Sequence, residues 1–580
     1  MLKLSRKYLA WWAVAIGTVF LIVQVICDLW LPNITSDIIN NGVAKSDISY
    51  IWNSGYKMLA ISLLGVLAAA VNVYFAATQS QKMGSKIRDA LFKKVSFLSN
   101  HEFEKFGDAS LITRTTNDVI QIQNVMVMIL RMMLQSPIML VGAGIMAYNK
   151  QPALTAVFLV AIPVLVFFVG IIMYFAVPLF QGMQKKIDRI NLVFREGLTG
   201  VRVIRAFNRD KFEQDRFGDA NKDYTHTAIK VFTIVSFMLP IMTLIMSGTN
   251  MGIIWYGAKL ISNQTMQVGN LVAFMTYAAQ ILMSFMMLSM VFVLIPRASA
   301  SAKRINEVLE MKNSVKDPEQ PVSTKDETKA ASLEFQNVDF RYKGAEDLAI
   351  DGANFKATAG QTVAIIGGTG SGKSTLVSLI PRFFDPEKGE ILINGTDVKT
   401  LSQKDVHAQV SLAQQKSVLF RGTIRENMQF GNPDATDDEI WHAMEIAQAT
   451  EFIHKDEDGL DAWVEQDGDN FSGGQKQRLT IARTLVKQAP VYVFDDSFSA
   501  LDFKTDAELR HSLREDSQIQ KSVVVIVAQR IATVADADLI LVIDKGKIVG
   551  QGTHQELKAN NDTYREIIDS QIKKGDQVNG

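Results

Sequence analysis

Six apolar stretches, each long enough to cross a lipid bilayer, restrict the fold of this chain more than any other feature of its sequence. A membrane-spanning helix needs about 20 consecutive apolar residues, and 48% of the 580 residues are hydrophobic. The first stretch follows a basic N-terminus, but it is too long for the core of a cleaved signal peptide, so we interpret it as a span. The predicted spans lie near residues 8–31, 56–79, 124–148, 153–180, 231–258 and 268–296.

The polar connections between these spans alternate in length, and their basic residues predict the orientation of the chain. The connections after the first, third and fifth spans are short and poor in Lys and Arg. The connections after the second and fourth spans are long and basic, as is the N-terminus with Lys3, Arg6 and Lys7. Because basic loops stay on the cytoplasmic side, we expect both termini and both long connections to lie in the cytoplasm.

Both long connections have the composition of helices, so we expect the spans to continue into the cytoplasm as long helical extensions. In the first connection, helix-forming residues surround Phe106 and Gly107. In the second, Ala206 and Phe207 belong to an apolar face that could dock on another domain. The alternative for each connection is a helical hairpin that remains in solvent.

A polar segment, residues 311–330, ends the apolar character of the first 310 residues. Its Pro, Ser, Lys and acidic residues are typical of a linker. Beyond it the runs TVAIIG and VYVFDD are typical of strands that are buried on both faces of a mostly parallel sheet. The predicted organisation is a six-helix transmembrane domain (1–310), a linker (311–330) and a soluble α/β nucleotide-binding domain (331–580).

The motif GGTGSGKST, residues 367–375, follows the strand TVAIIG and precedes a helical stretch. This is the context in which a P-loop closes backbone N–H groups around phosphates. The lysine of such a loop reaches the β- and γ-phosphates, and the serine hydroxyl binds Mg²⁺. We therefore expect ATP as the ligand, with Mg²⁺ on Ser374. The residues expected to contact the nucleotide are Gly367, Gly370, Gly372, Lys373, Ser374 and Thr375.

Two further motifs follow in the same domain. In VYVFDDSFSALD, residues 491–502, an apolar strand ends in Asp495, which would hold Mg²⁺, and Asp496, where the attacking water would be positioned. In NFSGGQKQRLTIARTL, residues 470–485, Ser472, Gly473 and Gly474 open a helix and form a second anion-binding N-terminus. One nucleotide does not need two such sites in one domain. We therefore expect the second site to serve a nucleotide held by another subunit.

With these motifs in this order, the sequence resembles the ATP-binding cassette (ABC) exporters over nearly its whole length. The resemblance implies that Tyr342 stacks on adenine and that Gln415 senses Mg²⁺ and contacts the membrane domain. The alternative for Tyr342 is an aromatic side chain of the core, and the alternative for Gln415 is a surface amide. It further implies that Ser472 to Gln475 form the signature motif and that Asp502 signals between two sites. The stretches near 103–115 and 203–213 match coupling helices, and six spans with one cassette imply a half-transporter that pairs with a second one.

The chain departs from the family pattern at two positions of one site. Asp496 occupies the position of the catalytic glutamate, and aspartate is shorter by one methylene, roughly 1.5 Å, which general-base geometry tolerates poorly. Gln529 occupies the position of a histidine that contacts the γ-phosphate, and Gln466 replaces a glutamate before the signature. Because the signature itself is intact, we expect a hydrolysis-impaired site in this chain and a competent site shared with a different partner, as in bacterial heterodimeric multidrug exporters.

The membrane part indicates an adaptable apolar cargo site. Flexible methionine side chains suit amphipathic, drug-like or lipid-like molecules, although lipid-facing or packing residues are the alternative. Arg131 either lines a cavity or reaches the membrane surface, and we interpret Asp28, near the outer end of the first span, as interfacial. The methionines are Met126, Met128, Met132, Met133, Met242, Met246, Met283, Met286, Met287 and Met290.

Composition and location complete the expectations. The net charge is +0, from 60 basic and 60 acidic residues, so nothing indicates a nucleic-acid partner. The expected surroundings are the lipid bilayer of a bacterial cytoplasmic (inner) membrane. Two alternatives to the heterodimer remain open: a homodimeric exporter that hydrolyses ATP slowly with Asp496, and a nucleotide-gated channel or regulator subunit.

Overall fold

The computed structural model describes residues 1–322 and 330–578, without the side chains of residues 2, 289–294 and 572–578. The chain forms two compact units. The helical unit comprises Met1–Ser96 and Ala109–Glu310, and the α/β unit comprises Phe97–Asp108 and the chain from Met311 onward. A short piece of the first long connection therefore belongs to the α/β unit.

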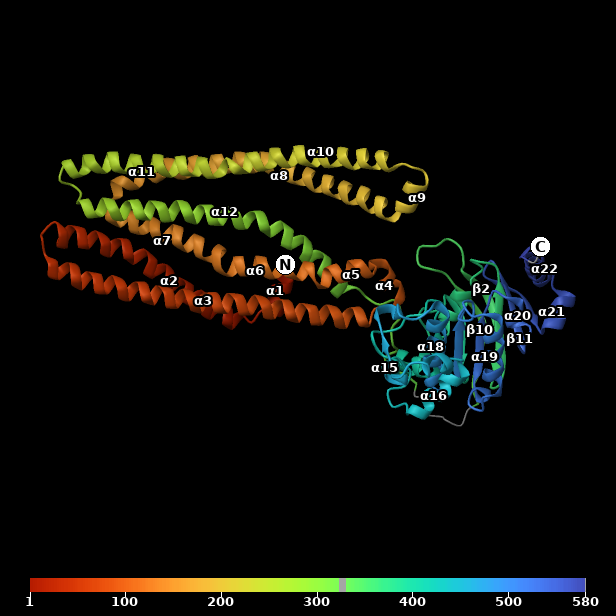
Figure 1. Ribbon diagram of the computed structural model, residues 1–580. Coiled ribbons are helices and arrows are strands. Elements are labelled where there is room, and N and C mark those ends of the chain that lie inside the picture. The colour runs from red at the N-terminus through yellow and green to blue at the C-terminus, as the bar shows by residue number, and fades with distance from the viewer. Residues whose placement is uncertain (323–329, 579–580) are drawn as a thin grey trace. The chain divides into compact units, whose positions relative to one another are not determined.

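The helical unit consists of long helices joined mostly by short turns (Figure 1). Short π-helical turns, η1 (Ile38–Val43) and η2 (Ile129–Met133), interrupt two of its spans. The helices are α1 (Leu2–Tyr8), α2 (Trp11–Asp37), α3 (Ile48–Ser96), α5 (Asp108–Thr115), α6 (Asn117–Met128), α7 (Leu134–Lys150), α8 (Pro152–Thr199), α9 (Val201–Ala206), α10 (Asp210–Ser236), α11 (Met238–Ser262) and α12 (Val268–Glu310).

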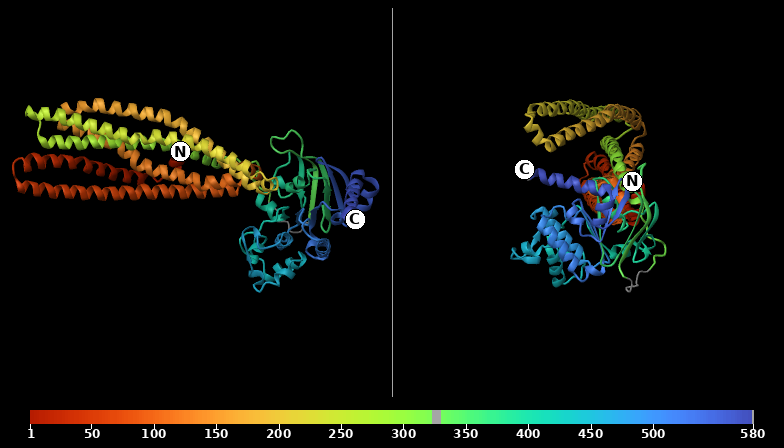
Figure 2. Two further views of the ribbon diagram at one scale, coloured as in Figure 1. Left: turned by 45° about the horizontal axis from the view of Figure 1, so that its top comes forward. Right: turned by 90° about the vertical axis from the view of Figure 1, so that its right-hand side faces the viewer.

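Among the described residues, six helical segments are long and apolar enough to cross a membrane, which confirms the six predicted spans. They are longer than the sequence indicated. α3 has 49 residues and α8 has 48, so each is about 70 Å long at 1.5 Å per residue, more than twice the apolar thickness of a bilayer. The predicted helical extensions are therefore confirmed. Figure 1 shows α8 and α10 side by side, joined at one end by α9, and the two helices are in contact. Figure 2 shows the helical unit from two further directions.

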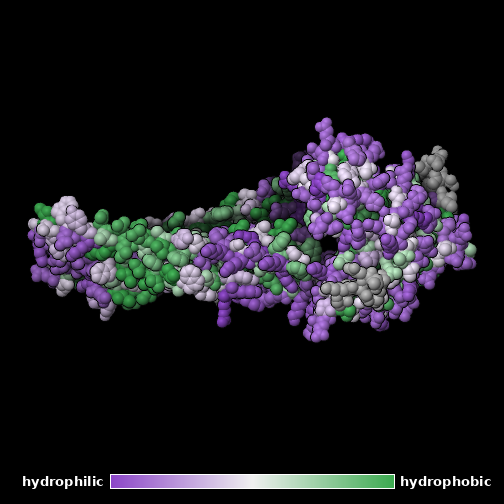
Figure 3. All heavy atoms as spheres, turned by 90° about the horizontal axis from the view of Figure 1, so that it is seen from below, coloured by the Kyte–Doolittle hydropathy of each residue, from purple (hydrophilic) through white to green (hydrophobic). Residues whose placement is uncertain are grey.

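The surface of the helical unit has the distribution of a membrane protein. In Figure 3 hydrophobic atoms gather in a band along its helices, with hydrophilic atoms on either side of that band. Large apolar side chains such as Leu159 (78% exposed) and Leu244 (73%) face outward, which is favourable only against lipid or a partner protein. The methionine set is divided, since Met126 and Met242 are buried and Met283 and Met287 are exposed. The side chain of Met290 lies outside the described residues, and Arg131 is exposed within η2.

A buried carboxylate joins α6 to α12. The side chain of Asp118 accepts hydrogen bonds from Ser301 Oγ (2.8 Å) and from Arg304 Nε (2.8 Å). The Asp118 side chain is 2% exposed and that of Arg304 is 46% exposed. Because a buried charge is tolerated only when it is paired, this ion pair ties the beginning of the third membrane helix to the end of the sixth.

The α/β unit contains a six-stranded, mostly parallel sheet and a four-stranded antiparallel sheet, in the orders β12-β11-β3-β10-β9-β6 and β2-β1-β4-β5. A two-stranded ribbon pairs β7 with β8. The strands are β1 (Ser332–Phe340), β2 (Ile350–Thr358), β3 (Thr362–Gly367), β4 (Lys388–Ile393), β5 (Thr396–Asp397), β6 (Val410–Ala413), β7 (Gly422–Thr423), β8 (Trp463–Val464), β9 (Val491–Asp495), β10 (Val523–Val527), β11 (Leu539–Asp544) and β12 (Lys547–Gly552).

Helices pack around these sheets and bury their apolar side chains. The strands β3, β9 and β10 are apolar at almost every position because both faces of the sheet are covered. The helices are α4 (Asn100–Phe106), α13 (Lys373–Leu379), α14 (Gln403–Gln409), α15 (Ile424–Gln429), α16 (Asp437–Ile446), α17 (Thr450–Ile453), α18 (Gly473–Val486), α19 (Phe503–Glu515), α20 (Ile531–Val534), α21 (His554–Asn560) and α22 (Asp562–Val578), and the 3-10 turns are η3 (Val398–Thr400), η4 (Gly459–Asp461), η5 (Gln466–Gly468) and η6 (Ile519–Lys521).

Candidate nucleotide-binding site

Four neighbouring strands bring the predicted site residues to one edge of the six-stranded sheet. β3, β10, β9 and β6 are adjacent and parallel, so their carboxyl ends meet at the edge where α/β proteins bind ligands. The P-loop follows β3, and Gln529 follows β10. Asp495 and Asp496 lie at the end of β9, and Gln415 follows β6. Residues that are more than 150 positions apart in the chain are therefore neighbours by topology.

The P-loop depends on glycine at its turn. Gly370 (φ +79°) and Gly372 (φ +107°) have left-handed backbone conformations, which glycine adopts without steric cost. A Cβ on Gly372 would also lie 2.9 Å from the carbonyl oxygen of Ala349. Lys373 Nζ donates to the carbonyl oxygens of Gly367 (3.0 Å) and Gly368 (2.7 Å). Burial lowers the pKa of Lys373, and the nearby carboxylates of Asp496 and Asp495 oppose that shift.

A cavity of about 880 Å³ opens beside this loop, and Tyr342 lies in its wall. The Tyr342 side chain is 37% exposed, and its ring packs edge-on against Phe340 and Phe384. Its hydroxyl is 3.1 Å from Thr375 Oγ1. Stacking on adenine remains a prediction, and the ring lines the cavity beside the P-loop. The predicted residues that line the cavity are Tyr342, Gly370, Gly372, Lys373, Ser374 and Thr375.

Two oxygen ligands suitable for Mg²⁺ lie next to the loop. Ser374 Oγ donates a hydrogen bond to Asp495 Oδ1 at 3.1 Å. Burial raises the pKa of Asp495, so a cation at this position would relieve an unfavourable buried charge. Protein-bound Mg²⁺ commonly takes one or two protein oxygens, with phosphates and water as its other ligands. Ser374 and Asp495 therefore fit the ion.

The carboxylate of Asp496 is held by two amides. Gln529 Nε2 donates to Asp496 Oδ2 at 2.9 Å, and Gln415 Nε2 donates to the same oxygen at 3.3 Å. The Asp496 backbone is left-handed (φ +51°), and the residue is 8% exposed. Burial raises the pKa of Asp496, and the two amide hydrogen bonds oppose the shift. Gln415 thus contacts Asp496, while its expected contact with Mg²⁺ remains a prediction.

The signature motif has a preorganised helix N-terminus. Ser472 Oγ accepts from the backbone N–H of Gln475 (3.3 Å), and Gln475 Oε1 accepts from the backbone N–H of Ser472 (2.8 Å), which forms a capping box for α18. Ser472 and Gly473 are exposed. A Cβ on Gly473 would have nothing within 4 Å, and one on Gly474 would lie 3.3 Å from the carbonyl oxygen of Ala500.

Two other predicted positions lie near this motif in the sequence. Asp502 caps α19, since its Oδ1 accepts from the backbone N–H of Thr505 at 3.0 Å, and this bond lowers the pKa of Asp502. Gln466 is exposed in the turn η5. The role of Asp502 in signalling between two sites remains a prediction, and so does the weakened contact with an opposite coupling helix that Gln466 implies in place of glutamate.

Sequence reasoning missed one residue that links the two motifs. Gln477, on α18, is 4% exposed. Its Nε2 donates to the carbonyl oxygen of Asp496 (3.3 Å), and its Oε1 accepts from the backbone N–H of Ala500 (3.1 Å). It therefore connects the signature helix to the turn after β9. The available signal was spacing: Gln477 stands four positions before Ile481 and eight before Leu485, so an amide shares the apolar face of a helix, where it needs partners.

Comparisons with known proteins agree with this geometry. The ABC transporter transmembrane region matches residues 14–285, and the ABC transporter family matches residues 350–499. The chain is 40% identical over 553 residues to the ABC transporter ATP-binding protein MT1311 of Mycobacterium tuberculosis (strain CDC 1551 / Oshkosh), covering 95% of this chain and 94% of that protein. It is 35% identical over 557 residues to YfiB of Bacillus subtilis (strain 168), covering 96% of each.

A solved structure supports the same fold. A bacterial Atm1-family ABC exporter with ATP bound superposes with a TM-score of 0.79 and 24% identity, covering 96% of this chain and 98% of the other. One transmembrane region and one ATP-binding domain follow each other in this chain. The chain therefore belongs to the ABC transporter family, as a multi-pass half-transporter with the exporter fold, whose α/β unit is an ATPase domain coupled to transport.

Proposed function

We propose that this chain is one subunit of a heterodimeric, ATP-driven exporter and that its own ATP site binds the nucleotide but hydrolyses it poorly. The observation that carries the proposal is the pair of amides on Asp496. In the proposed assembly, the P-loop of this chain and the partner's signature enclose one ATP molecule. The signature of this chain completes the partner's competent site.

The two amides explain why hydrolysis would be impaired. A general base must present a free lone pair to water in a defined direction. Oδ2 of Asp496 already accepts hydrogen bonds from Gln529 and Gln415. Oδ1 belongs to a side chain that is one methylene shorter than glutamate, so it would stop short of the position from which a glutamate oxygen contacts water. The raised pKa makes this carboxylate more basic than an ordinary aspartate, so the limitation is one of position rather than of basicity. Gln529 is neutral and cannot exchange a proton as histidine does.

Binding of ATP needs only groups that are in place. The backbone N–H groups of the P-loop and Lys373 would hold the β- and γ-phosphates, and Tyr342 would stack on the base. Mg²⁺ on Ser374 and Asp495 would neutralise phosphate charge. The lowered pKa of Lys373 reflects partial burial of its ammonium group, and phosphate oxygens would stabilise its charged form.

The signature of this chain is suited to a second nucleotide. Ser472 and Gly473 lie exposed at the start of a 14-residue helix, whose first N–H groups carry a partial positive charge. ABC exporters are dimers, and a partner's γ-phosphate would be the natural anion at this position. The exposed apolar side chains of α9 and the following turn, Val203 (61%) and Phe207 (74%), are a second surface that a partner would cover.

For the membrane part, we propose export of amphipathic or drug-like molecules across a bacterial cytoplasmic membrane, with both termini in the cytoplasm. The exposed methionines Met283 and Met287 on α12 support an adaptable apolar surface. The homodimeric exporter remains the second candidate. The raised pKa of Asp496 favours it, because a more basic carboxylate is a better proton acceptor.

The test compares nucleotide binding with turnover. The chain, purified without a partner half-transporter, is expected to bind a fluorescent ATP analogue and to lose that binding in Lys373→Ala. Its ATPase rate should stay well below the 1–10³ s⁻¹ typical of enzymes. The double variant Asp496→Glu with Gln529→His should raise that rate only a few-fold, because the opposing signature would still be missing. A turnover equal to that of a complete exporter would support the homodimer instead.

A further inference from the structure

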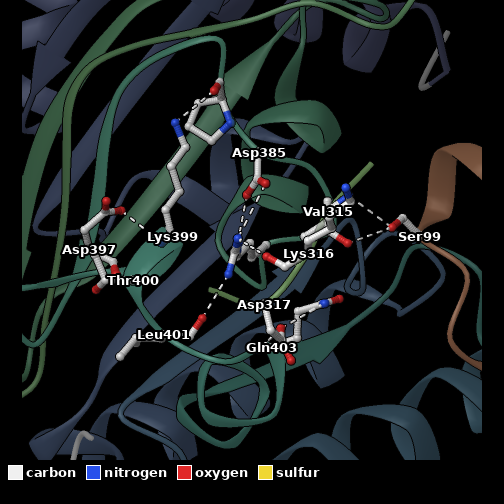
Figure 4. Close-up of polar contacts among 12 residues, drawn as sticks. Ser99, Val315, Lys316, Asp317, Asp385, Asp397, Lys399, Thr400, Leu401 and Gln403 are labelled. Atoms are coloured by element: carbon white, nitrogen blue, oxygen red, sulfur yellow. Dashed lines mark hydrogen bonds and ion pairs between the residues drawn. The ribbon is translucent and has the colours of Figure 1, made fainter. Parts of the chain in front are cut away.

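The described part of the predicted linker is not a free coil. Residues 313–317, here called the strap, run between α4 and the rest of the α/β unit and hydrogen-bond to both (Figure 4). Val315, at the middle of the strap, is 2% exposed. Farther along, the backbone N–H of Val322 donates to the carbonyl oxygen of Thr400 at 3.0 Å. Polar composition predicted a linker, but here the polar groups serve as specific contacts.

On one side the strap is bonded to α4. Ser99 Oγ accepts from the backbone N–H of Val315 (3.2 Å) and lies 3.4 Å from its carbonyl oxygen. Glu102 Oε2 accepts from both the backbone N–H (3.2 Å) and the hydroxyl (2.9 Å) of Ser314. Asn313 also donates to the carbonyl oxygen of Phe97. Glu102 is 4% exposed, so a buried carboxylate depends on the strap for its partners.

On the other side the strap is bonded to the core of the α/β unit. Arg382 Nη2 donates to the carbonyl oxygen of Lys316 at 2.9 Å. Asp317 Oδ1 accepts from the backbone N–H (2.9 Å) and from Nε2 (3.0 Å) of Gln403. Figure 4 shows these bonds converging on the strap from different parts of the chain.

Arg382 is the central residue of this arrangement. It follows α13, the helix that begins at Lys373 of the P-loop, and its own backbone is left-handed (φ +56°). It is 4% exposed. Besides Lys316, its guanidinium donates to Asp385 Oδ1 (2.8 Å) and to the carbonyl oxygen of Leu401 (2.9 Å). A guanidinium stays charged and has five N–H donors in a rigid fork, so only arginine can make all these bonds at once.

Breaks in the helical backbone separate α4 from its neighbours on either side. α3 ends at Ser96, before α4 begins. Gly107, between α4 and α5, has φ +70°, and a Cβ there would have nothing within 4 Å, so backbone conformation rather than space requires the glycine. α4 is therefore a short separate helix, hydrogen-bonded to the strap within the α/β unit.

We propose that Arg382 is a positioning residue that links the ATP-binding helix α13 to α4 of the same chain through the strap. A displacement of α13 when ATP binds would pull on Arg382, and Arg382 would pass it through the carbonyl of Lys316 to Ser314, Ser99 and Glu102. The link acts within one chain and does not require the partner subunit. It rests on the proposed binding of ATP at the P-loop and deepens it, because it assigns a mechanical output to a site that hydrolyses poorly.

Hydrogen exchange can test this link in the full-length protein, purified from its cells with any partner that accompanies it. Amide exchange of residues 97–108 is measured with and without ATP, and ATP binding is measured separately with a fluorescent analogue. In the wild type, ATP should slow exchange in α4 several-fold. In Arg382→Lys, which keeps the charge but not the fork, ATP affinity should stay within about twofold while the exchange response of α4 disappears.

Two further variants make the result decisive. Lys316→Ala removes an exposed side chain but keeps the carbonyl that Arg382 binds, so it should behave as the wild type. The double variant Ser99→Ala with Glu102→Ala removes the side-chain bonds to Val315 and Ser314 on the α4 side, away from the P-loop, and should also abolish the response. It decides the question if Arg382→Lys does not fold. A response of α4 that persists in this double variant and in Arg382→Lys would overturn the proposal, as would a wild type that binds ATP without any response of α4. Absence of ATP binding in the wild type would instead refute the proposed function.

Discussion

The substitution Gly473→Asp in the assembled transporter is the most direct test of which site hydrolyses ATP. Gly473 is the first residue of α18 and is exposed, and its Cβ would meet nothing within 4 Å. A carboxylate at this position also favours the helix N-terminus by about 0.3–1 kcal/mol. The variant should therefore fold normally, and any loss of activity should come from the partner's nucleotide.

The size of that loss follows from the charges involved. Two like charges about 4 Å apart repel by roughly 4 kcal/mol near a protein surface, and each 1.4 kcal/mol is tenfold in rate. Loss of one donor of the oxyanion-hole type costs about 10²–10³-fold. We expect Gly473→Asp to lower the ATPase rate by about 10²–10³-fold. The matched variant Gly473→Asn has the same size without the charge and should retain distinctly more activity.

The comparison is made with Asp496→Asn in the same membrane preparation, by phosphate release. Asp496 lies in the site that we propose to be poor at hydrolysis. Replacing its carboxylate with an amide should therefore reduce the total ATPase rate only a few-fold. If Asp496→Asn is as severe as Gly473→Asp, then Asp496 is a working base and the homodimeric exporter becomes the better reading.

Three other perturbations test the structure more widely. Burial raises the pKa of Asp496, so the folded protein holds this proton more tightly than the unfolded chain, and the ionised carboxylate destabilises the fold above the folded pKa. Asp496→Asn should thus raise the apparent Tm of the nucleotide-free protein at pH 8, by about 2–4 °C for each kcal/mol gained, and a scan at pH 4 should show little gain. Arg304→Met leaves the buried Asp118 carboxylate without its guanidinium partner and should lower the free energy of unfolding by about 3–5 kcal/mol. Asp118→Asn should cost less, because the guanidinium that loses its partner is half-exposed. Equal losses of thermal stability in the two variants would contradict the pairing. Phe207→Ser, beside α9, should lower cargo export in vesicles several-fold at unchanged ATP binding, and unaltered export would leave this turn without a docking role.

Hydropathy predicted the six spans because a bilayer requires a long apolar helix whatever the protein does. Their ends were less predictable. α8 continues to Thr199 through a polar stretch. Outside the lipid a helix does not need an apolar surface all round, but only residues that favour the helical conformation and a neighbour, such as α10, to pack against. The P-loop was predictable because its chemistry depends on local residues, namely glycines at φ +79° and +107° and the lysine that follows.

The contacts of Asp496 could not be derived from local sequence. Gln415 and Gln529 meet at one carboxylate only because β6, β9 and β10 are neighbours in the sheet, and strand order is a property of the whole domain. The strap illustrates a different limit. Pro, Ser and charged residues are common both in free linkers and in segments whose polar groups are hydrogen-bonded to the protein. Composition therefore cannot distinguish a Ser314 hydroxyl that donates to Glu102 from one that is hydrated.

The membership of α4 in the α/β unit has a consequence for how the protein is made. The unit is assembled from two stretches of chain, Phe97–Asp108 and the chain from Met311 onward, with roughly 200 residues between them. At a synthesis rate of about 5–20 residues per second, α4 emerges from the ribosome roughly 10–40 s before the residues that it binds. The carboxylate of Glu102 must stay hydrated throughout that interval, while the third to sixth spans enter the membrane. The α/β unit can therefore complete its fold only after the membrane helices have been synthesised, which makes membrane insertion an earlier step than assembly of the ATPase domain.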